Sequence, residues 1–345
     1  MLIPEYTRVQ GQRQSQSTAT KDGATGHQRK EIVCMYKNSF TAQAGLTNDT
    51  IPLAQKLDKL LKILDPLDCS WKHRETSSTR QSDTCLWFPA TDAYRSWREG
   101  KDTFLWLQGK GVSFDGSNGS VTDTNVTTAG AGKSVLACVH VICYWGRVAD
   151  YASSSSVIND LHDTKNDGEI LVYFYCDFRT KRSTSALEVM RSLLALLTES
   201  LCRIITDPEA LLDELLKGAD SRVHPFYNVK ALAHYLSKVV QLCPRKPLVV
   251  VDALDECREV ETLIDGLLTF GGDVQMFVTT RPLQNIIRML SHLPYISMDE
   301  KTNELSADIL LHVTREVDSR SRLRTFDRTL KEEIRFKLCA KADGM

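Results

Sequence analysis

The sequence lacks the long apolar runs and the charge excess that mark two large classes of protein. Its longest apolar runs, such as LVVV and LVYFY, fall far short of the roughly 20 residues that cross a bilayer. Lys+Arg number 43 and Asp+Glu number 44, which gives a net charge of −1. Because no excess charge attracts nucleic acid or an anionic membrane, we predict neither as a partner.

Signals of secretion and of zinc binding are also missing. The first residues, MLIPEYTRVQGQRQS, hold no basic segment followed by an apolar stretch, which is the pattern of a secretory signal. The 10 cysteines include no CxxC pair and no Cys/His spacing of a zinc site. We therefore expect reduced thiols and a cytoplasmic protein.

The composition that remains is that of a folded protein with a polar N-terminal tail. Hydrophobic residues make up 42% and charged residues 25%, which are ordinary globular values. Residues 1–45 are rich in Gln, Ser, Thr, Lys and Gly, so we predict a disordered tail. Residues 46–82 are predicted as a linker with one amphipathic helix over 53–64, whose leucines recur at helical spacing. That helix docks on the following domain or binds a partner.

Short apolar runs alternate with helical patterns in the rest of the chain. The runs are TFLWLQ at 103–108, ILVYFYCDF at 170–178, PLVVVDA at 247–253, VQMFVTT at 274–280 and YISM at 295–298. The middle runs are continuously apolar rather than alternating, which is typical of a parallel sheet covered on both faces. We therefore predict an α/β domain over 83–300, a doubly wound, mainly parallel sheet with helices on both faces. Residues 301–345 are predicted as a helical extension, the truncated start of a lid.

The run GAGKSVLA at 130–137 has the residue types of a phosphate-binding loop. Glycines let backbone N–H groups curl around phosphates, Lys133 reaches the β and γ oxygens, and the Ser134 hydroxyl binds Mg²⁺. The full spacing, G-x-x-x-x-G-K-S, requires glycine at position 127, where the chain has Thr127. The predicted nucleotide-binding residues are Gly109, Gly130, Ala131, Gly132, Lys133, Ser134 and Val135.

Two segments interrupt this motif. Residues 111–128, rich in Gly, Ser, Thr, Asn and Asp, separate Gly109-Lys110 from Ala129. Without them the chain reads GKAGAGKS, which satisfies the spacing, so we interpret the segment as an insertion and hypothesise a translated retained intron. A second segment, about 138–153, separates the helix opened by KSVLA from SSSSVINDLH. It is either a second insertion or part of a longer helix followed by a loop.

Carboxylates follow the buried run in KPLVVVDALDEC. The run delivers Asp252 to the carboxyl end of a strand, where a Mg²⁺-bound triphosphate would lie. Ser134 and Asp252 are therefore the predicted metal residues, the aspartate acting through water. Asp255 and Glu256 come three and four residues later, placed to polarise an attacking water.

The next run, MFVTTRP, ends in a hydroxyl and a cation. Thr280 and Arg281 emerge at the same edge of the predicted sheet, where they could sense the γ-phosphate. The predicted catalytic residues are therefore Asp255, Glu256 and Arg281.

The ordered motifs resemble those of the NACHT-type P-loop NTPases of the STAND signalling class. The form resembled is abundant in filamentous fungi and related to the nephrocystin-type N-terminal domain. The motifs, spread over about 75–345, are TCLWFPATDAYRSW, FLWLQGK with GAGKSVLA, VYFYCDFR, KPLVVVDALDEC, FVTTRP and KADGM. The family's loop lysine and serine match Lys133 and Ser134, and its acidic residues match Asp252, Asp255 and Glu256.

The resemblance implies a switch in non-self recognition or cell death, in which bound ADP or ATP controls self-oligomerisation. It also implies ankyrin, WD40 or similar repeats, whereas this chain stops at Met345. We expect Mg²⁺ with ATP or GTP as cofactor, slow hydrolysis, and protein partners reached by self-oligomerisation or effector domains. The alternative is a pseudo-NTPase interaction scaffold, in which the split loop no longer cradles phosphate. A metabolic kinase is disfavoured by the acidic cluster in DALDEC.

Overall fold

A computed structural model describes residues 52–79, 83–109, 154–219 and 225–342. Lys56–Met345 forms one unit by its internal contacts, and this unit contains the whole sheet. Within the described ranges, no helix is long and apolar enough to cross a membrane.

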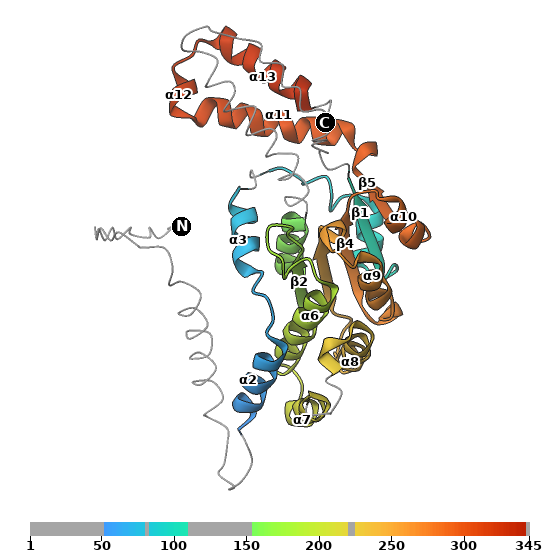
Figure 1. The fold of residues 1–345 in the computed structure, drawn as a ribbon. Coiled ribbons are helices and arrows are strands. Elements are labelled where there is room, and N and C mark those ends of the chain that lie inside the picture. Colours follow the sequence, from blue (N-terminus) through green and yellow to red (C-terminus); the bar gives the residue numbers. More distant parts are fainter. Residues whose placement is uncertain (1–51, 80–82, 110–153, 220–224, 343–345) are drawn as a thin grey trace, which may run out of the picture. The chain divides into compact units, whose positions relative to one another are not determined.

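The sheet contains β1 (Phe104–Gln108), β2 (Leu171–Tyr175), β3 (Leu248–Asp252), β4 (Gln275–Thr280) and β5 (Tyr295–Ser297). The strand order is β2-β3-β4-β1-β5 and every pair is parallel (Figure 1). All residues of β3 and β4 are buried, which explains the uninterrupted apolar runs LVVV in β3 and MFV in β4. The predicted α/β class with a parallel sheet is confirmed.

The strand register brings the carboxyl ends of the strands together at one edge. Gln108 at the end of β1 pairs with Thr280 at the end of β4, and Tyr175 at the end of β2 pairs with Asp252 at the end of β3. The N–H of Gly109 continues this ladder by donating to the carbonyl of Thr280 at 3.3 Å. Because β4 lies between β1 and β3, it separates the strand leading to the GAGKS run from the strand ending in Asp252.

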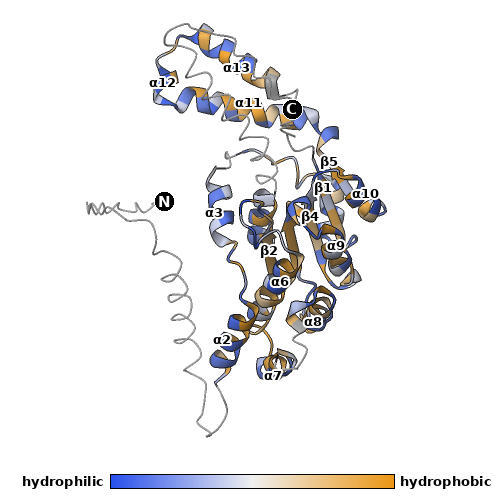
Figure 2. Cartoon of the chain, in the orientation of Figure 1, coloured by the Kyte–Doolittle hydropathy of each residue, from blue (hydrophilic) through white to orange (hydrophobic). Residues whose placement is uncertain are grey.

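Helices surround the sheet. They are α4 (Asp92–Arg98), α6 (Ala186–Leu201), α7 (Pro208–Ala219), α8 (Val229–Gln241), α9 (Val260–Leu268) and α10 (Gln284–Leu290), with short 3-10 turns η1 (Pro225–Tyr227), η2 (Leu254–Glu256), η3 (Gly271–Asp273) and η4 (Met298–Glu300). Residues 154–164 are also helical. Figure 2 shows hydrophobic colour concentrated on the strands, while the surrounding helices mix both colours, as helices with one buried side do.

Before β1, the motif TCLWFPATDAYRSW becomes an aromatic cluster on the sheet. Thr91 caps α4 by accepting a hydrogen bond from the N–H of Tyr94, and both Tyr94 and Trp97 are buried. The rings of Phe88 and Trp97 contact the ring of Phe277 on β4, with centroids 5.7 and 5.8 Å away. This segment therefore belongs to the core of the α/β fold.

Two helices lie in the stretch predicted as helix and linker. α2 (Leu53–Leu64) covers the range that the leucine spacing predicts. α3 (Ser70–Thr79) was not predicted, because its sequence, SWKHRETSST, has no apolar periodicity. Its buried side chains are polar, those of Lys72 and Thr76, so polar contacts hold it in place.

The chain beyond β5 forms a helical extension. It consists of α11 (Thr302–Ser319), α12 (Ser321–Arg324) and α13 (Arg328–Ala342). These helices share a small core of Val313, Val317, Leu323 and Leu338. The carboxylate of Asp308 on α11 accepts hydrogen bonds from the N–H of Cys85 at 2.9 Å and the indole N–H of Trp87 at 3.1 Å. The extension is thus tied to the segment before α4.

Replacing Phe277 tests the aromatic cluster. The side chain is fully buried, so Phe277→Ala should lower the free energy of unfolding by about 3–5 kcal/mol. Phe336→Ala is the control, because Phe336 is 75% exposed and its truncation should cost little. Urea denaturation followed by circular dichroism measures both, and equal losses would contradict the proposed packing.

Candidate functional site

The most deeply buried acid at the sheet edge is Asp252, at the end of β3. Its side chain is 1% exposed. One oxygen, Oδ1, accepts hydrogen bonds from the hydroxyls of Ser154 and Thr279. The other, Oδ2, is buried with no hydrogen-bond partner among the described residues. The two oxygens therefore differ, because Oδ1 has two hydrogen-bond donors and Oδ2 has none among the described residues.

The surroundings of Asp252 change its acidity. Burial raises its pKa to about 7, although the two hydroxyl hydrogen bonds act in the opposite direction. The negative charges of Glu256 and Asp255 add to the increase. A cation near Oδ2 would compensate this cost, because it favours the ionised form.

The turn after β3 is held in an unusual backbone conformation. Ala253 has φ 54°, ψ 50°, a left-handed geometry that non-glycine residues rarely adopt and that costs roughly 1–3 kcal/mol. Its N–H donates to the Thr279 hydroxyl at 2.9 Å, and that hydroxyl donates to Asp252 at 2.6 Å. Thr279 thus links the Asp252 carboxylate to the backbone of the turn that leads into η2.

Asp255 and Arg281, two of the predicted catalytic residues, form an ion pair. The N–H of Arg281 donates to Asp255 Oδ1 at 2.9 Å, and its Nε donates to Oδ2 at 2.6 Å. The Asp255 side chain is only 4% exposed, whereas that of Arg281 is 42% exposed. Both oxygens of Asp255 are therefore engaged by Arg281, and the pair joins the turn after β3 to the end of β4.

Glu256, the third predicted catalytic residue, contacts the loop after β2. Its Oε2 accepts a hydrogen bond from the N–H of Phe178 at 2.6 Å. Burial raises the pKa of Glu256 above its ordinary value, against the effect of this hydrogen bond. A carboxylate with a raised pKa is a better proton acceptor near neutral pH.

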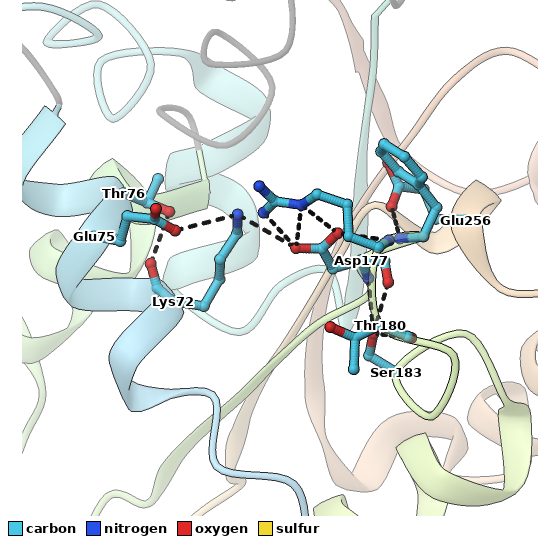
Figure 3. A network of polar contacts seen from close by, with 9 residues as sticks. Lys72, Glu75, Thr76, Asp177, Thr180, Ser183 and Glu256 are labelled. Atoms are coloured by element: carbon cyan, nitrogen blue, oxygen red, sulfur yellow. Dashed lines mark hydrogen bonds and ion pairs between the residues drawn. The ribbon is translucent and has the colours of Figure 1, made fainter. Parts of the chain in front are cut away.

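Next to Phe178, Asp177 is the centre of a polar network (Figure 3). Its carboxylate accepts hydrogen bonds from Nε and Nη2 of Arg179, the shortest being 2.5 Å. Lys72 on α3 lies 3.5 Å from the same carboxylate. Burial acts to raise the pKa of Asp177, but Arg179 and Lys72 outweigh it and hold the pKa below its usual value. Asp177 is thus ionised and neutralised by two cations.

The remaining predicted site residues divide into two groups. Gly109 lies at the end of β1, on the same edge as Asp252 and Arg281. Gly130, Ala131, Gly132, Lys133, Ser134 and Val135 lie outside the described residues, as do the predicted insertions 111–128 and 138–153. Their roles stay predictions.

Sequence reasoning missed Ser154, Thr279 and Asp177. Thr279 could have been identified from the pairing register of β3 and β4. Val251 pairs with Val278, so the next positions, Asp252 and Thr279, lie side by side on parallel strands. Ser154 had no such signal, because its partner Asp252 lies far away in the sequence, and the same holds for the contact of Asp177 with Lys72.

Comparison with known proteins gives a match to a protein family. A family model described as nephrocystin 3, N-terminal, matches residues 152–281, and that family is related to NACHT-like NTPases. The matched range runs from the helix at 154–164 through β2, β3 and β4 to Arg281. No curated protein and no solved structure matches the chain significantly. The chain therefore contains a region similar to the nephrocystin 3 N-terminal domain, on a parallel α/β sheet of the P-loop NTPase type.

Asp252→Asn tests the electrostatic cost of this site. The native pKa of about 7 exceeds the unfolded value of about 3.9, so the folded chain binds more protons and loses stability as pH rises from about 4 to 7. The Asn variant escapes that loss and should be the more stable chain at pH 8, by at most about 4 kcal/mol. At pH 4.5 the advantage should fall to about 1 kcal/mol, because the unfolded aspartate is then still largely ionised.

Thermal melts without nucleotide or magnesium measure this difference. Asp255→Asn is the matched control, because it removes the ion pair with Arg281 and should destabilise the chain at pH 8. An Asp252→Asn variant that is less stable than the native chain at pH 8 would contradict the argument.

Proposed function

We propose that this chain binds a nucleoside triphosphate, ATP or GTP, with Mg²⁺ and hydrolyses it slowly. The observation that carries the proposal is the buried Asp252, whose Oδ2 has no partner within the described part of the chain. It lies at the carboxyl edge of a parallel sheet, where ligands of open α/β folds bind. β1, which precedes the GAGKS run, ends at the same edge.

The residues suit magnesium. Mg²⁺ prefers oxygen ligands, keeps several waters and is bound through one or two carboxylates plus substrate phosphates. Asp252 supplies such a carboxylate, and in the described ranges no three His, Cys, Asp or Glu side chains gather into a protein-only metal cage. Asp252 and Ser134 would hold the ion, which when bound would neutralise charge on the β- and γ-phosphates.

The other acidic residues and Arg281 supply the remaining roles. Glu256, with its raised pKa, accepts the proton of the attacking water. Arg281 contacts the γ-phosphate, and because its Nε engages Asp255, phosphate and Asp255 compete for this cation. This competition makes the Arg281–Asp255 pair sensitive to the bound nucleotide.

The signalling role is the finer part of the proposal. We propose a STAND-type switch in fungal NLR-like non-self recognition or cell death, acting in the cytoplasm through self-oligomerisation or effector domains. The ordered motifs of the sequence and the match to the nephrocystin 3 N-terminal family support it. One observation favours a pseudo-NTPase scaffold instead, namely that residues 111–128 split the phosphate-loop motif.

Binding of a labelled ATP analogue, with GTP as competitor, tests the proposal. The chain should bind the analogue in the presence of Mg²⁺, and Lys133→Ala should weaken binding at least about tenfold, because a phosphate contact is lost. Lys246→Ala is the control, because Lys246 is an exposed lysine two residues before β3, at the opposite end of the strand from Asp252.

A deletion variant separates the two candidate functions. Removing residues 111–128 restores the uninterrupted spacing, so binding that appears only in this variant would identify the chain as a scaffold. Absence of binding in both the native chain and the deletion variant would defeat the nucleotide proposal.

A further inference from the structure

α3 is attached to the α/β fold through polar side chains. Its buried residues are Lys72 and Thr76, and its one large apolar side chain, Trp71, is 49% exposed. The ring of His73 contacts the Tyr175 hydroxyl at 2.9 Å and the Asn159 amide oxygen at 3.1 Å. Such contacts depend on exact alignment far more than apolar packing does. Docking of α3 is therefore specific for one arrangement of β2 and the helix at 154–164.

Lys72 is the cation of this interface. Its side chain is 8% exposed, and its Nζ lies 3.5 Å from Asp177 and 3.6 Å from Glu75. A lysine removed from water is strongly destabilising when its anionic partner is lost. The carboxylates of Asp177 and Glu75 therefore both compensate the buried charge of Lys72, and Asp177 is the more deeply buried of the two.

Asp177 in turn organises the loop that carries Phe178. The N–H of Asp177 donates to the Ser183 hydroxyl at 3.2 Å, and that hydroxyl donates to the Asp177 carbonyl at 2.8 Å. The N–H of Arg179 donates to the Asp177 carboxylate at 3.0 Å, and the N–H of Thr180 donates to the Asp177 carbonyl at 2.9 Å. The peptide between Asp177 and Phe178 is thus fixed on both sides.

The same peptide holds Glu256, through the N–H of Phe178 at 2.6 Å. We propose that Lys72 is a positioning residue for Glu256, acting through Asp177 and the 177–178 peptide, so that docking of α3 sets the orientation of the proposed base (Figure 3). This inference deepens the proposed function and rests on it for the role of Glu256. By linkage, a ligand that displaces α3 would remove the Lys72 contact from Asp177 and so weaken the alignment of the Phe178 N–H with Glu256.

Lys72→Met removes the charge and keeps most of the side-chain length, while Lys72→Arg keeps the charge. The chain offers a matched control in Lys56→Met. Lys56 is equally buried, at 8%, and pairs with Glu209 and Asp213 on α7 at 2.6 and 2.7 Å. Both Met variants lose a buried ion pair, but only Lys72→Met affects Asp177.

The first measurement is amide hydrogen exchange in the native chain and the three variants, without nucleotide. The peptide covering 176–183 should exchange on the order of tenfold faster in Lys72→Met than in Lys56→Met, because one charge-assisted interaction is worth about that factor. Lys72→Arg should stay close to native. Equal exchange in the two Met variants would overturn the coupling, whatever the chain does with nucleotide.

The second measurement is single-turnover hydrolysis beside nucleotide affinity. In Lys72→Met the rate should fall about tenfold with affinity within about twofold of native, and Lys56→Met should change neither. The acid limb of the pH–rate profile should move to higher pH. Loss of the hydrogen bond from the Phe178 N–H would raise the pKa of Glu256, because this bond favours the ionised carboxylate. The other charged groups that act on this pKa are Asp255, Asp177 and Arg281. Faster exchange with an unchanged rate would overturn the positioning role. Absence of hydrolysis by the native chain would defeat the proposed function, leaving the exchange result to decide the coupling.

Discussion

The arrangement of the sheet edge depends on the burial of one carboxylate. An ionised Asp252 in the interior is costly, and two hydroxyls on a single oxygen reduce that cost. Those hydroxyls come from β4 and from the helix at 154–164, so the register of β3 against β4 and the position of that helix must both be as they are. A shift of β3 against β4 by one residue would turn Thr279 to the other face of the sheet. The Asp252 carboxylate would then lose one of its two hydrogen-bond donors.

A second set of contacts extends this constraint across three strands. η2 follows the left-handed Ala253. Its two consecutive acidic residues contact the loops after two different strands, which lie on opposite sides of β3. Asp255 pairs with Arg281 after β4, and Glu256 binds the Phe178 N–H after β2. The edge is therefore held together by one ion pair and one hydrogen bond to the backbone. In the proposed function, a triphosphate that contacts Arg281 would compete with Asp255 for this cation, so its binding would change the turn after β3 and the end of β4 together.

The sequence predicts the strands because buried parallel strands need continuous apolar runs, and Asp252 and Arg281 directly follow such runs. It does not reveal the contacts between strand ends, since the order β2-β3-β4-β1-β5 places β1 beside β4, far away in the chain. For that reason Asp255 and Arg281 were predicted as separate catalytic groups, whereas the structure joins them. α3 escaped prediction for a different reason, because its buried residues are a lysine and a threonine.

The two candidate functions share this edge and differ in what they require of the GAGKS run. Asp252, its two hydroxyls, the Asp255–Arg281 pair and the Glu256–Phe178 contact all lie within residues 154–281. The match to the nephrocystin 3 N-terminal family covers nearly the same range. An NTPase and a scaffold would both need this edge of the sheet, so similarity in this range does not distinguish the two functions. In the proposed function, nucleotide affinity would depend on Lys133 and on the glycine-rich run between β1 and residue 154, where we predict the insertions, so changes in that segment would distinguish the two functions.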